Sequence, residues 1–389
     1  MAQPDTSAKL AYVDASRGIA ILLVILVHTA YRVPGLDGAF MALVEFGQWG
    51  VQLFFVVSAF TLCASQHARY EGRVTVGYFY LRRFFRIAPL YYFGILLYFV
   101  VFQALAPRPQ DLMLGPYTAG NVAANLAFVH GLVPWAQNNI VPGGWSIGVE
   151  MAFYLLFPLL HVLLLGHHRR SQWVLPVAFV AAIGINLGVQ FALSGWSDMG
   201  SAYSDFMYLN LVNNLPVFVL GFWLYQHAQN GGAMGRSRLI EVLCSWFLFL
   251  GFALAALALH ASAAPWGFTL TPTLAGLAFV GLVNALRLHH WRLRPLAVIG
   301  QVSYSMYLLH FLFAALLVPA VLRALPEATD MTPPALMLAL AYPAVIALSY
   351  ACARVTERLI ETPGMALGAR MAARWAGAYP QAARSVSAR

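Results

Sequence analysis

Charged residues are scarce in this chain. Of its 389 residues, 10% are Asp, Glu, Lys or Arg, and 61% are hydrophobic. Soluble domains usually carry about a quarter of charged residues and about half of apolar ones. This composition excludes an ordinary soluble domain and predicts a protein that crosses a membrane many times.

Cysteine is nearly absent, and no cofactor motif is present. Cys63, Cys244 and Cys352 are far apart, each in or beside an apolar stretch. Their spacing excludes a disulfide framework and a cysteine-based metal site, so we expect buried free thiols. The chain also has no phosphate-binding P-loop and no dinucleotide fingerprint. We therefore expect neither a metal nor a bound cofactor.

One short segment matches a catalytic motif but lies in the wrong structural setting for catalysis. The segment GWSIG, Gly144–Gly148, fits the pattern G-x-S-x-G. That pattern marks a nucleophile only at a turn between a strand and a helix. Here a long apolar helix is expected to follow, so we expect Ser146 to cap that helix rather than to attack a substrate.

Apolar stretches of about 20 residues, the length that spans a bilayer, occur ten times. They lie near residues 15–33, 46–64, 87–106, 145–165, 173–193, 211–228, 239–260, 267–286, 297–320 and 334–356. The sequence therefore predicts an all-α, polytopic membrane helix bundle with about ten transmembrane helices. We expect residues 1–365 to form this integral-membrane domain and residues 366–389 to form a loose cytoplasmic tail.

The basic residues predict the orientation in the membrane. Assigning them to alternate sides of ten spans places 20 of the 23 on one side. The other side receives Arg32, Arg108 and Arg323. Because basic residues concentrate in cytoplasmic loops, both termini are expected to be cytoplasmic. This distribution explains the net charge of +9 without a nucleic-acid partner.

Arginine and aromatic residues alternate before the third span, in Val76–Tyr92. This pattern predicts an interfacial helix at the inner leaflet. The arginines could simply hold anionic lipid. Alternatively, Arg83 and Arg86, one turn apart, could bind a phosphorylated ligand.

His28 is an ionisable residue deep inside the first span, and such residues usually mark function. It follows Arg17 by eleven positions, which is about three helical turns and about 16.5 Å. Both side chains should therefore point along one face of the helix. His28 could be a hydrogen-bonded packing residue, or it could be a general base, because neutral imidazole accepts a proton near pH 7.

Two further ionisable residues lie within spans. Glu150 could be a carboxylate placed by the helix dipole, or it could contact His28, since their estimated depths are similar. A carboxylate bonded to one ring nitrogen would then fix the tautomer of His28. His310 follows Ser303 and Tyr304 and could be a packing residue. In a transporter or flippase, these His and Glu residues would instead relay protons.

Several ordered motifs resemble the membrane acyltransferase-3 family, the integral-membrane sugar O-acyltransferases. Arg17 and His28 match the family's Arg/Lys-x10-His signature. The segment GVQLFFVVSAF, Gly50–Phe60, is similar to its GVxLFFxxSGF motif, with Ala59 in place of the usual glycine. The segment RRFFRIAPLYY supplies the family's arginine pair as Arg83 and Arg86. The remaining matches are WSIGVEMAFYLLFP with Glu150, IGQVSYSMYLLH with His310, and ERLIETP.

The resemblance implies an acyl group, usually acetyl, that moves from cytoplasmic acyl-CoA, the co-substrate, to a carbohydrate hydroxyl. The acceptor would be an exported polysaccharide, lipopolysaccharide or another lipid-linked glycan at the bacterial inner membrane. In this hypothesis His28 and Glu150 are catalytic, either directly or through an acyl-enzyme. Arg17, Arg83 and Arg86 bind the donor. The acceptor or supporting residues are Trp145, Tyr154, Ser303, Tyr304 and His310.

Overall fold

The computed structural model describes residues 11–70, 76–102, 117–138, 140–166, 172–194, 201–230, 238–262, 267–288, 293–325 and 331–378. Within these residues every regular element is helical, which confirms the all-α prediction. The α-helices of the first half are α1 (Ala11–Ala30), α2 (Gly38–Glu45), α3 (Gly50–Tyr70), α4 (Val76–Val100), α5 (Ala119–Leu126), α6 (Gly144–Leu165) and α7 (Val174–Leu193). Those of the second half are α8 (Ser201–Leu209), α9 (Leu211–Gln229), α10 (Arg238–Ala261), α11 (Gly267–Leu288), α12 (Arg294–Gln301), α13 (Ser303–Phe311), α14 (Val318–Ala324), α16 (Pro334–Thr356) and α17 (Thr362–Ala378).

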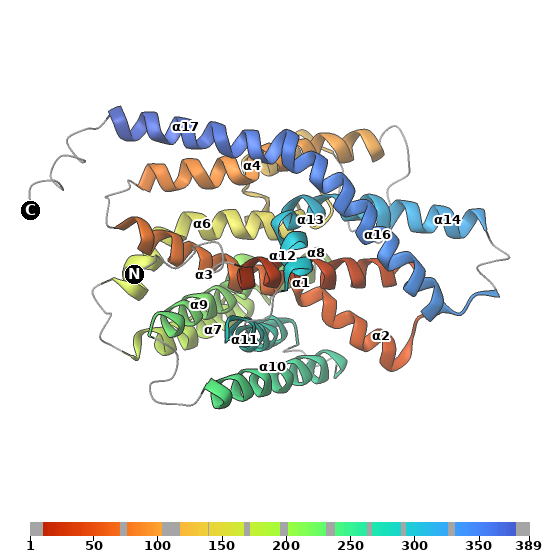
Figure 1. The fold of residues 1–389 in the computed structure, drawn as a ribbon, viewed down its shortest axis with the longest axis horizontal. Helices are drawn as coiled ribbons and strands as arrows, with labels where there is room; N and C mark the ends of the chain where they lie inside the picture. The colour runs from red at the N-terminus through yellow and green to blue at the C-terminus, as the bar shows by residue number, and fades with distance from the viewer. Residues whose placement is uncertain are drawn as a thin grey trace, which may run out of the picture.

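Ten helical segments of the described chain are long and apolar enough to cross a membrane, as the sequence predicts. They are Ala11–Ala30, Gly38–Gln66, Val76–Val100, Gly144–Leu165, Val174–Leu193, Asp205–Gln229, Arg238–Ala261, Thr269–Leu288, Ser303–Ala324 and Pro334–Arg374. Most run roughly along the long axis of the molecule (Figure 1). The start of α1 and the end of α17 point toward the same end of the bundle, as an even number of spans requires.

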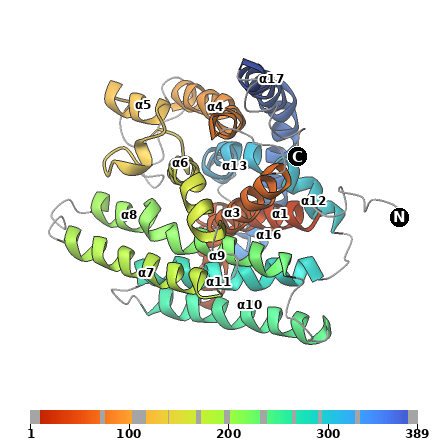
Figure 2. The same ribbon diagram turned by 90° about the vertical axis from the view of Figure 1, so that its left-hand side faces the viewer.

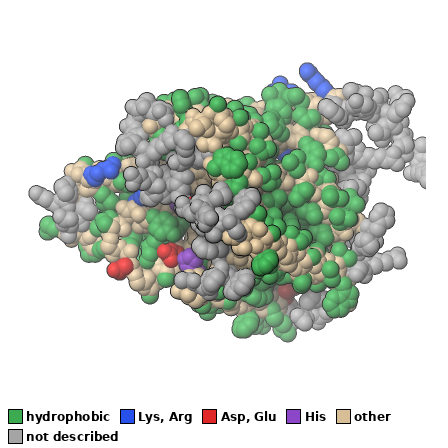
Figure 3. All heavy atoms as spheres, turned by 180° about the vertical axis from the view of Figure 1, so that it is seen from behind, with side chains coloured by type: hydrophobic (Ala, Val, Ile, Leu, Met, Phe, Trp, Pro, Cys, Tyr) green, Lys and Arg blue, Asp and Glu red, His purple; other side chains and the backbone are tan. Residues whose placement is uncertain are grey.

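The outer surface of the bundle is apolar. Hydrophobic side chains cover much of the described surface in Figure 3, and charged side chains are few there. Phe191 on α7 and Phe247 on α10 are largely exposed. A soluble protein rarely exposes such large apolar areas, so this surface fits contact with lipid.

Helix α1 lies inside the bundle, and its packing fixes where Arg17 and His28 point. It packs against α3, α12, α13 and α16, and the end-on view in Figure 2 shows it surrounded by other helices. Small residues allow the closest approach, as is usual between membrane helices. A Cβ atom at Gly18 would lie 2.1 Å from the Leu296 carbonyl oxygen, and one at Gly300 would lie 1.8 Å from that of Asp14.

Two segments differ from the sequence prediction. The arginine-rich stretch from residue 76 is not a separate interfacial helix, because α4 continues without a break to Val100 and contains Pro89. Arg83 and Arg86 are therefore fixed on a membrane-spanning helix. Residues 366–378, expected in the loose tail, instead continue α17, which packs against α4. Residues 379–389 lie outside the described residues.

Candidate functional site

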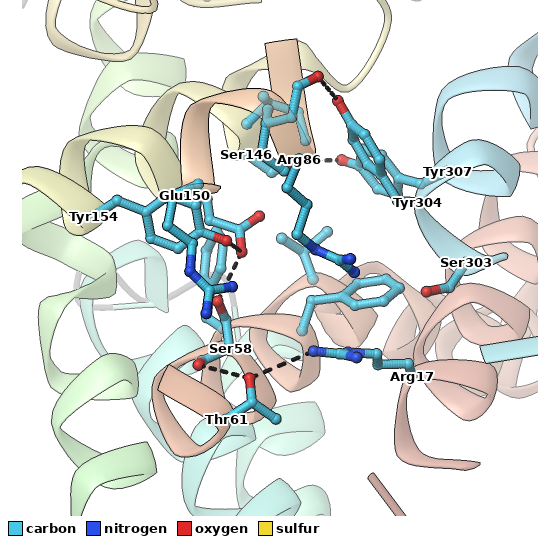
Figure 4. A pocket seen from close by; sticks show the side chains of 16 residues that line it. Arg17, Ser58, Thr61, Arg86, Ser146, Glu150, Tyr154, Ser303, Tyr304 and Tyr307 are labelled. Carbon is cyan, nitrogen blue, oxygen red and sulfur yellow. Dashed lines mark hydrogen bonds between the residues drawn. The ribbon is translucent and has the colours of Figure 1, made fainter. Parts of the chain in front are cut away.

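A cavity with about 670 Å³ of empty volume lies between α1, α3, α4, α6 and α13. We call it the arginine cavity, because Arg17, Arg83 and Arg86 line it. Its other polar lining residues are Ser58, Thr61, Ser146, Glu150, Tyr154, Ser303, Tyr304 and Tyr307 (Figure 4). The predicted donor-binding residues thus lie together, although they come from two helices far apart in sequence.

The three guanidinium groups are held mostly by weak or uncharged contacts. Arg17 lies 3.6 Å from the Asp14 carboxylate and donates a 3.4 Å hydrogen bond to Thr61. Arg83 donates to Ser65 at 3.4 Å and lies over the ring of Tyr154. Within the described residues, Arg86 contacts no carboxylate and donates only to the sulfur of Met365. Arg86 in particular therefore keeps N–H donors available for a ligand.

Glu150 lies on the wall of the same cavity, one turn before Tyr154 on α6. Its Oε1 atom accepts hydrogen bonds from Ser58 at 2.7 Å and from Tyr154 at 2.5 Å. Its Oε2 atom accepts none from the described residues. Ser58, a residue of an apolar span that the sequence did not predict as a site residue, is therefore a partner of Glu150.

The arginine cavity suits a polyanion. Among the described lining residues three are permanent cations and only Glu150 is an acid. Arginine binds phosphate through several parallel N–H bonds, and it remains charged when partly buried. The described residues contain no cluster of His, Cys, Asp and Glu that could hold a metal ion.

The local structure around the start of α6 fixes Ser146 and Glu150. A Cβ atom at Gly131 would lie 2.9 Å from the Gly148 carbonyl carbon, so the 3-10 turn His130–Leu132 packs directly on α6. The Nε2–H group of His130 donates to the Gly144 carbonyl at 3.0 Å. Burial lowers the pKa of His130, so this contact is made by a neutral ring.

A second cavity, with about 2010 Å³ of empty volume, lies next to the first. We call it the histidine cavity, because His28 lines it. The rings of Tyr31, Trp49, Trp145, Tyr208 and Phe311 line it, together with the polar residues Arg32, Gln48, Asn138, Asp205, His260 and Thr271. Aromatic faces with a few polar groups are typical of sites for small organic ligands.

The hydrogen bonds of His28 define its tautomer. Its Nδ1 atom lies 2.8 Å from the Val24 carbonyl oxygen, which can only accept, so Nδ1 carries the proton. The same N–H group lies 3.3 Å from Nε2 of His310. His310 in turn donates from Nδ1 to the Tyr307 carbonyl at 2.7 Å. In the neutral ring the Nε2 atom of His28 is therefore unprotonated, and no described residue bonds to it.

This arrangement corrects the predicted His28–Glu150 contact, which the structure does not contain. Glu150 lines the arginine cavity, His28 lines the histidine cavity, and His310 is the side-chain partner of His28. Helix α3 packs against both α1 and α6. His28 and Glu150 were predicted to lie at similar depths in the membrane, but similar depth alone does not bring two residues on α1 and α6 into contact. Trp145 and Tyr154 are likewise divided, with Trp145 in the histidine cavity and Tyr154 in the arginine cavity.

The sequence also misplaced or missed several polar residues. Ser146 does not cap α6: the helix begins at Gly144 after Gly143, whose φ is 73°. Its hydroxyl group instead donates to Tyr307 at 2.8 Å. Thr61 and Tyr307 line the arginine cavity and were not predicted. For Thr61, polarity within an apolar span was the only signal, whereas Tyr307 also lies within the motif match IGQVSYSMYLLH.

The close contact between α3 and α9 explains why Ala59 is tolerated where the motif has glycine. A Cβ atom at Gly221 would lie 2.6 Å from the Ala59 Cβ atom and 2.6 Å from the Val56 oxygen. The glycine that permits this close approach is therefore supplied by α9. Ala59 lines neither cavity.

The fold and the two cavities define a polytopic membrane protein. It has a positively charged ligand-binding cavity next to a cavity that contains a histidine. The sequence profile of a family described as "Acyltransferase domain", acyltransferase-3, matches residues 10–354. The chain belongs to this family of membrane acyltransferases, which favours the enzyme over a transporter or flippase.

Two of three similar relatives have names that describe acyl transfer. The chain is 26% identical over 314 residues to the putative membrane-bound transacylase BcsY of Komagataeibacter xylinus, covering 77% of this chain and 71% of the relative. It is 29% identical over 188 residues to the acyltransferase MdmB of Streptomyces mycarofaciens, covering 46% of each. It is 31% identical over 150 residues to protein 2 in the picA locus of Rhizobium radiobacter, covering 37% of this chain and 71% of the relative. No solved structure matches the chain.

Proposed function

We propose that this membrane acyltransferase moves an acyl group, acetyl in the simplest case, from cytoplasmic acyl-CoA to a hydroxyl group of an exported or cell-surface carbohydrate. The observation that carries the proposal is the pair of adjacent cavities. One presents three arginines, and the other presents a histidine whose Nε2 atom is unprotonated. We place the enzyme in the bacterial inner membrane, with both termini cytoplasmic.

The donor is assigned to the arginine cavity. The phosphates of acyl-CoA would bind Arg17, Arg83 and Arg86, which face the cytoplasm in the orientation that the basic residues indicate. Arg17 and His28 are eleven residues apart on α1, or about 16.5 Å along the helix. An extended pantetheine arm is long enough to bring the thioester from the phosphate site toward His28.

The acceptor hydroxyl is assigned to the histidine cavity. The Nε2 atom of His28 removes the hydroxyl proton as the oxygen attacks the thioester carbonyl carbon. The tetrahedral intermediate then collapses, the carbon–sulfur bond breaks, and the imidazolium returns the proton to the CoA sulfur. A general base of this kind contributes about 10²- to 10⁴-fold. His310 and the Val24 carbonyl hold the ring through Nδ1, which leaves Nε2 without a bond to any described residue.

The aromatic rings of the histidine cavity support a carbohydrate acceptor. Sugar rings present apolar C–H faces and hydroxyl edges, which match aromatic planes and polar side chains. Trp145 and Tyr208 provide such planes, and Gln48 and Asn138 provide amide groups. The carbohydrate class itself comes from the resemblance of the motifs to sugar O-acyltransferases.

The test is acyl transfer in inverted membrane vesicles that contain the protein. Labelled acetyl-CoA and a glycan extract from the host are added to the wild type and to a His28→Ala variant. We expect label in the glycan with the wild type only. No label with the wild type, with folded protein and several glycans tried, would contradict the proposed reaction. Equal label in both would contradict the role of His28.

A further inference from the structure

Tyr307 is the larger of two described side chains that line both cavities. Among the described residues, only Tyr307 and Val51 line both the arginine cavity and the histidine cavity. The Tyr307 side chain is almost fully buried, so its ring is packed on most sides where the two cavities meet. In Figure 4, Ser146 and Tyr307 lie at the end of the arginine cavity opposite Arg17 and Thr61.

The position of this ring is held by specific contacts. Its hydroxyl group donates to the Gly143 carbonyl at 3.0 Å and accepts from Ser146 at 2.8 Å. Gly143 has a φ of 73°, and a Cβ atom there would lie 2.9 Å from the Tyr307 hydroxyl oxygen. Glycine is therefore required at position 143 for two reasons: the turn needs a positive φ, and a Cβ atom would collide with the Tyr307 hydroxyl group. The ring of Phe54 packs edge-on against the Tyr307 ring, with 6.1 Å between the ring centroids.

Tyr307 is also connected to the proposed base. Its backbone carbonyl accepts the hydrogen bond from His310, which contacts His28. Tyr307 therefore connects Gly143 and Ser146, through its side chain, to His310 and His28, through its backbone carbonyl. A movement of α13 that displaced the ring would also affect this pair.

We infer that Tyr307 is a partition that separates the donor thioester from the acceptor cavity until transfer, and so selects the acceptor hydroxyl over water. This inference rests on the proposed function for the identity of the two ligands. Without the ring, water in the histidine cavity would reach the thioester. It would add to the carbonyl carbon, the carbon–sulfur bond would break, and the products would be the free acid and CoA. Exclusion of water from a reactive group is a known role of closed active sites.

The partition can be tested without any acyl transfer. Ile147 lines the arginine cavity alone and is not part of the proposed machinery. An Ile147→Cys variant, with Cys63, Cys244 and Cys352 replaced by alanine, is placed in sealed vesicles. A membrane-impermeant thiol reagent is then added to one face of the membrane or to the other. We expect the cysteine to react from one face when Tyr307 is present and from both faces in Tyr307→Ala.

Two matched variants distinguish loss of the partition from a general loosening of the helix packing. Tyr307→Phe retains the ring and should keep reaction at one face. Tyr304→Ala removes a ring from the same helix that lines only the arginine cavity, and it should also keep reaction at one face. Reaction from both faces with Tyr307 present would overturn the inference. So would reaction from one face only, or from neither, in Tyr307→Ala, with folding checked by size-exclusion chromatography.

A second readout follows the chemistry. In Tyr307→Ala the ratio of acetyl-CoA hydrolysis to acyl transfer should rise at least several-fold, and in Tyr307→Phe it should change little. An unchanged ratio in Tyr307→Ala would overturn the selection of hydroxyl over water. Absence of any transfer in the wild type would contradict the proposed function instead, and the accessibility measurement would still decide the partition.

Discussion

The arginine cavity and the histidine cavity are neighbours with opposite chemistry. The first is lined by three guanidinium groups, one carboxylate and several hydroxyl groups. The second is lined by aromatic rings, two amides, one Arg and one Asp of opposite charge (Arg32 and Asp205) and two histidines, of which His28 is held in one tautomer. In the proposed function, binding of the charged donor and activation of the acceptor are thus separated in space. Variants in one cavity should therefore alter different kinetic constants from variants in the other.

The largest effect is expected for His28→Gln, which removes the base from the histidine cavity. The turnover number for transfer should fall by about 10²- to 10⁴-fold, while CoA binding stays close to that of the wild type. Transfer of labelled acetyl groups and equilibrium binding of CoA measure the two quantities. A large loss of CoA affinity with an unchanged turnover number would show that the two cavities are not functionally distinct.

The next largest effect is expected for Arg86→Ala in the arginine cavity. Loss of a hydrogen bond to a charged group costs about 1.5–3 kcal/mol, so CoA affinity should fall by about 10- to 150-fold. Arg82→Ala is the matched control, because Arg82 lies on the same helix, donates to Tyr78 and does not line the cavity. An equal loss in both variants would mean that the arginines act through the membrane surface.

A smaller effect is expected for His310→Leu, which removes the acceptor without adding another. His310 accepts the Nδ1–H bond of His28 at 3.3 Å, and a neutral hydrogen bond contributes about 0.5–1.5 kcal/mol. The turnover number should fall by about 2- to 12-fold with CoA affinity unchanged. If CoA affinity fell instead, His310 would belong functionally to the arginine cavity.

The smallest effect is expected for Glu150→Gln. This change removes the one carboxylate among the described lining residues of the arginine cavity, while an amide oxygen can still accept from Ser58 and Tyr154. CoA should bind slightly more tightly, and more so at low salt, because repulsion of the phosphates is removed. If the turnover number fell as far as it does in His28→Gln, Glu150 would have to act directly on His28, contrary to this account.

The sequence predicted the helices better than it predicted the contacts between them. Length and hydropathy locate ten spans, and helical periodicity places Arg17 and His28 on the interior side of α1. The pairing of Glu150 failed because depth along the membrane normal is one coordinate of three. Lateral position depends on which helices pack together, and α3 packs against both α1 and α6.

The neutral polar residues were harder to predict than the charged ones. Ser58 and Tyr307 resemble many packing residues in membrane helices. Only the three-dimensional structure shows that Ser58 bonds Glu150 and that Tyr307 lines both cavities. The charged and ionisable residues stood out because lipid makes them costly.

The most direct test of the account is a cryo-EM map of the wild-type protein with bound CoA. We predict phosphate density among Arg17, Arg83 and Arg86, with the thiol end directed toward Tyr307 and His28. Phosphate density in the histidine cavity, or at the membrane surface away from these three arginines, would contradict the account.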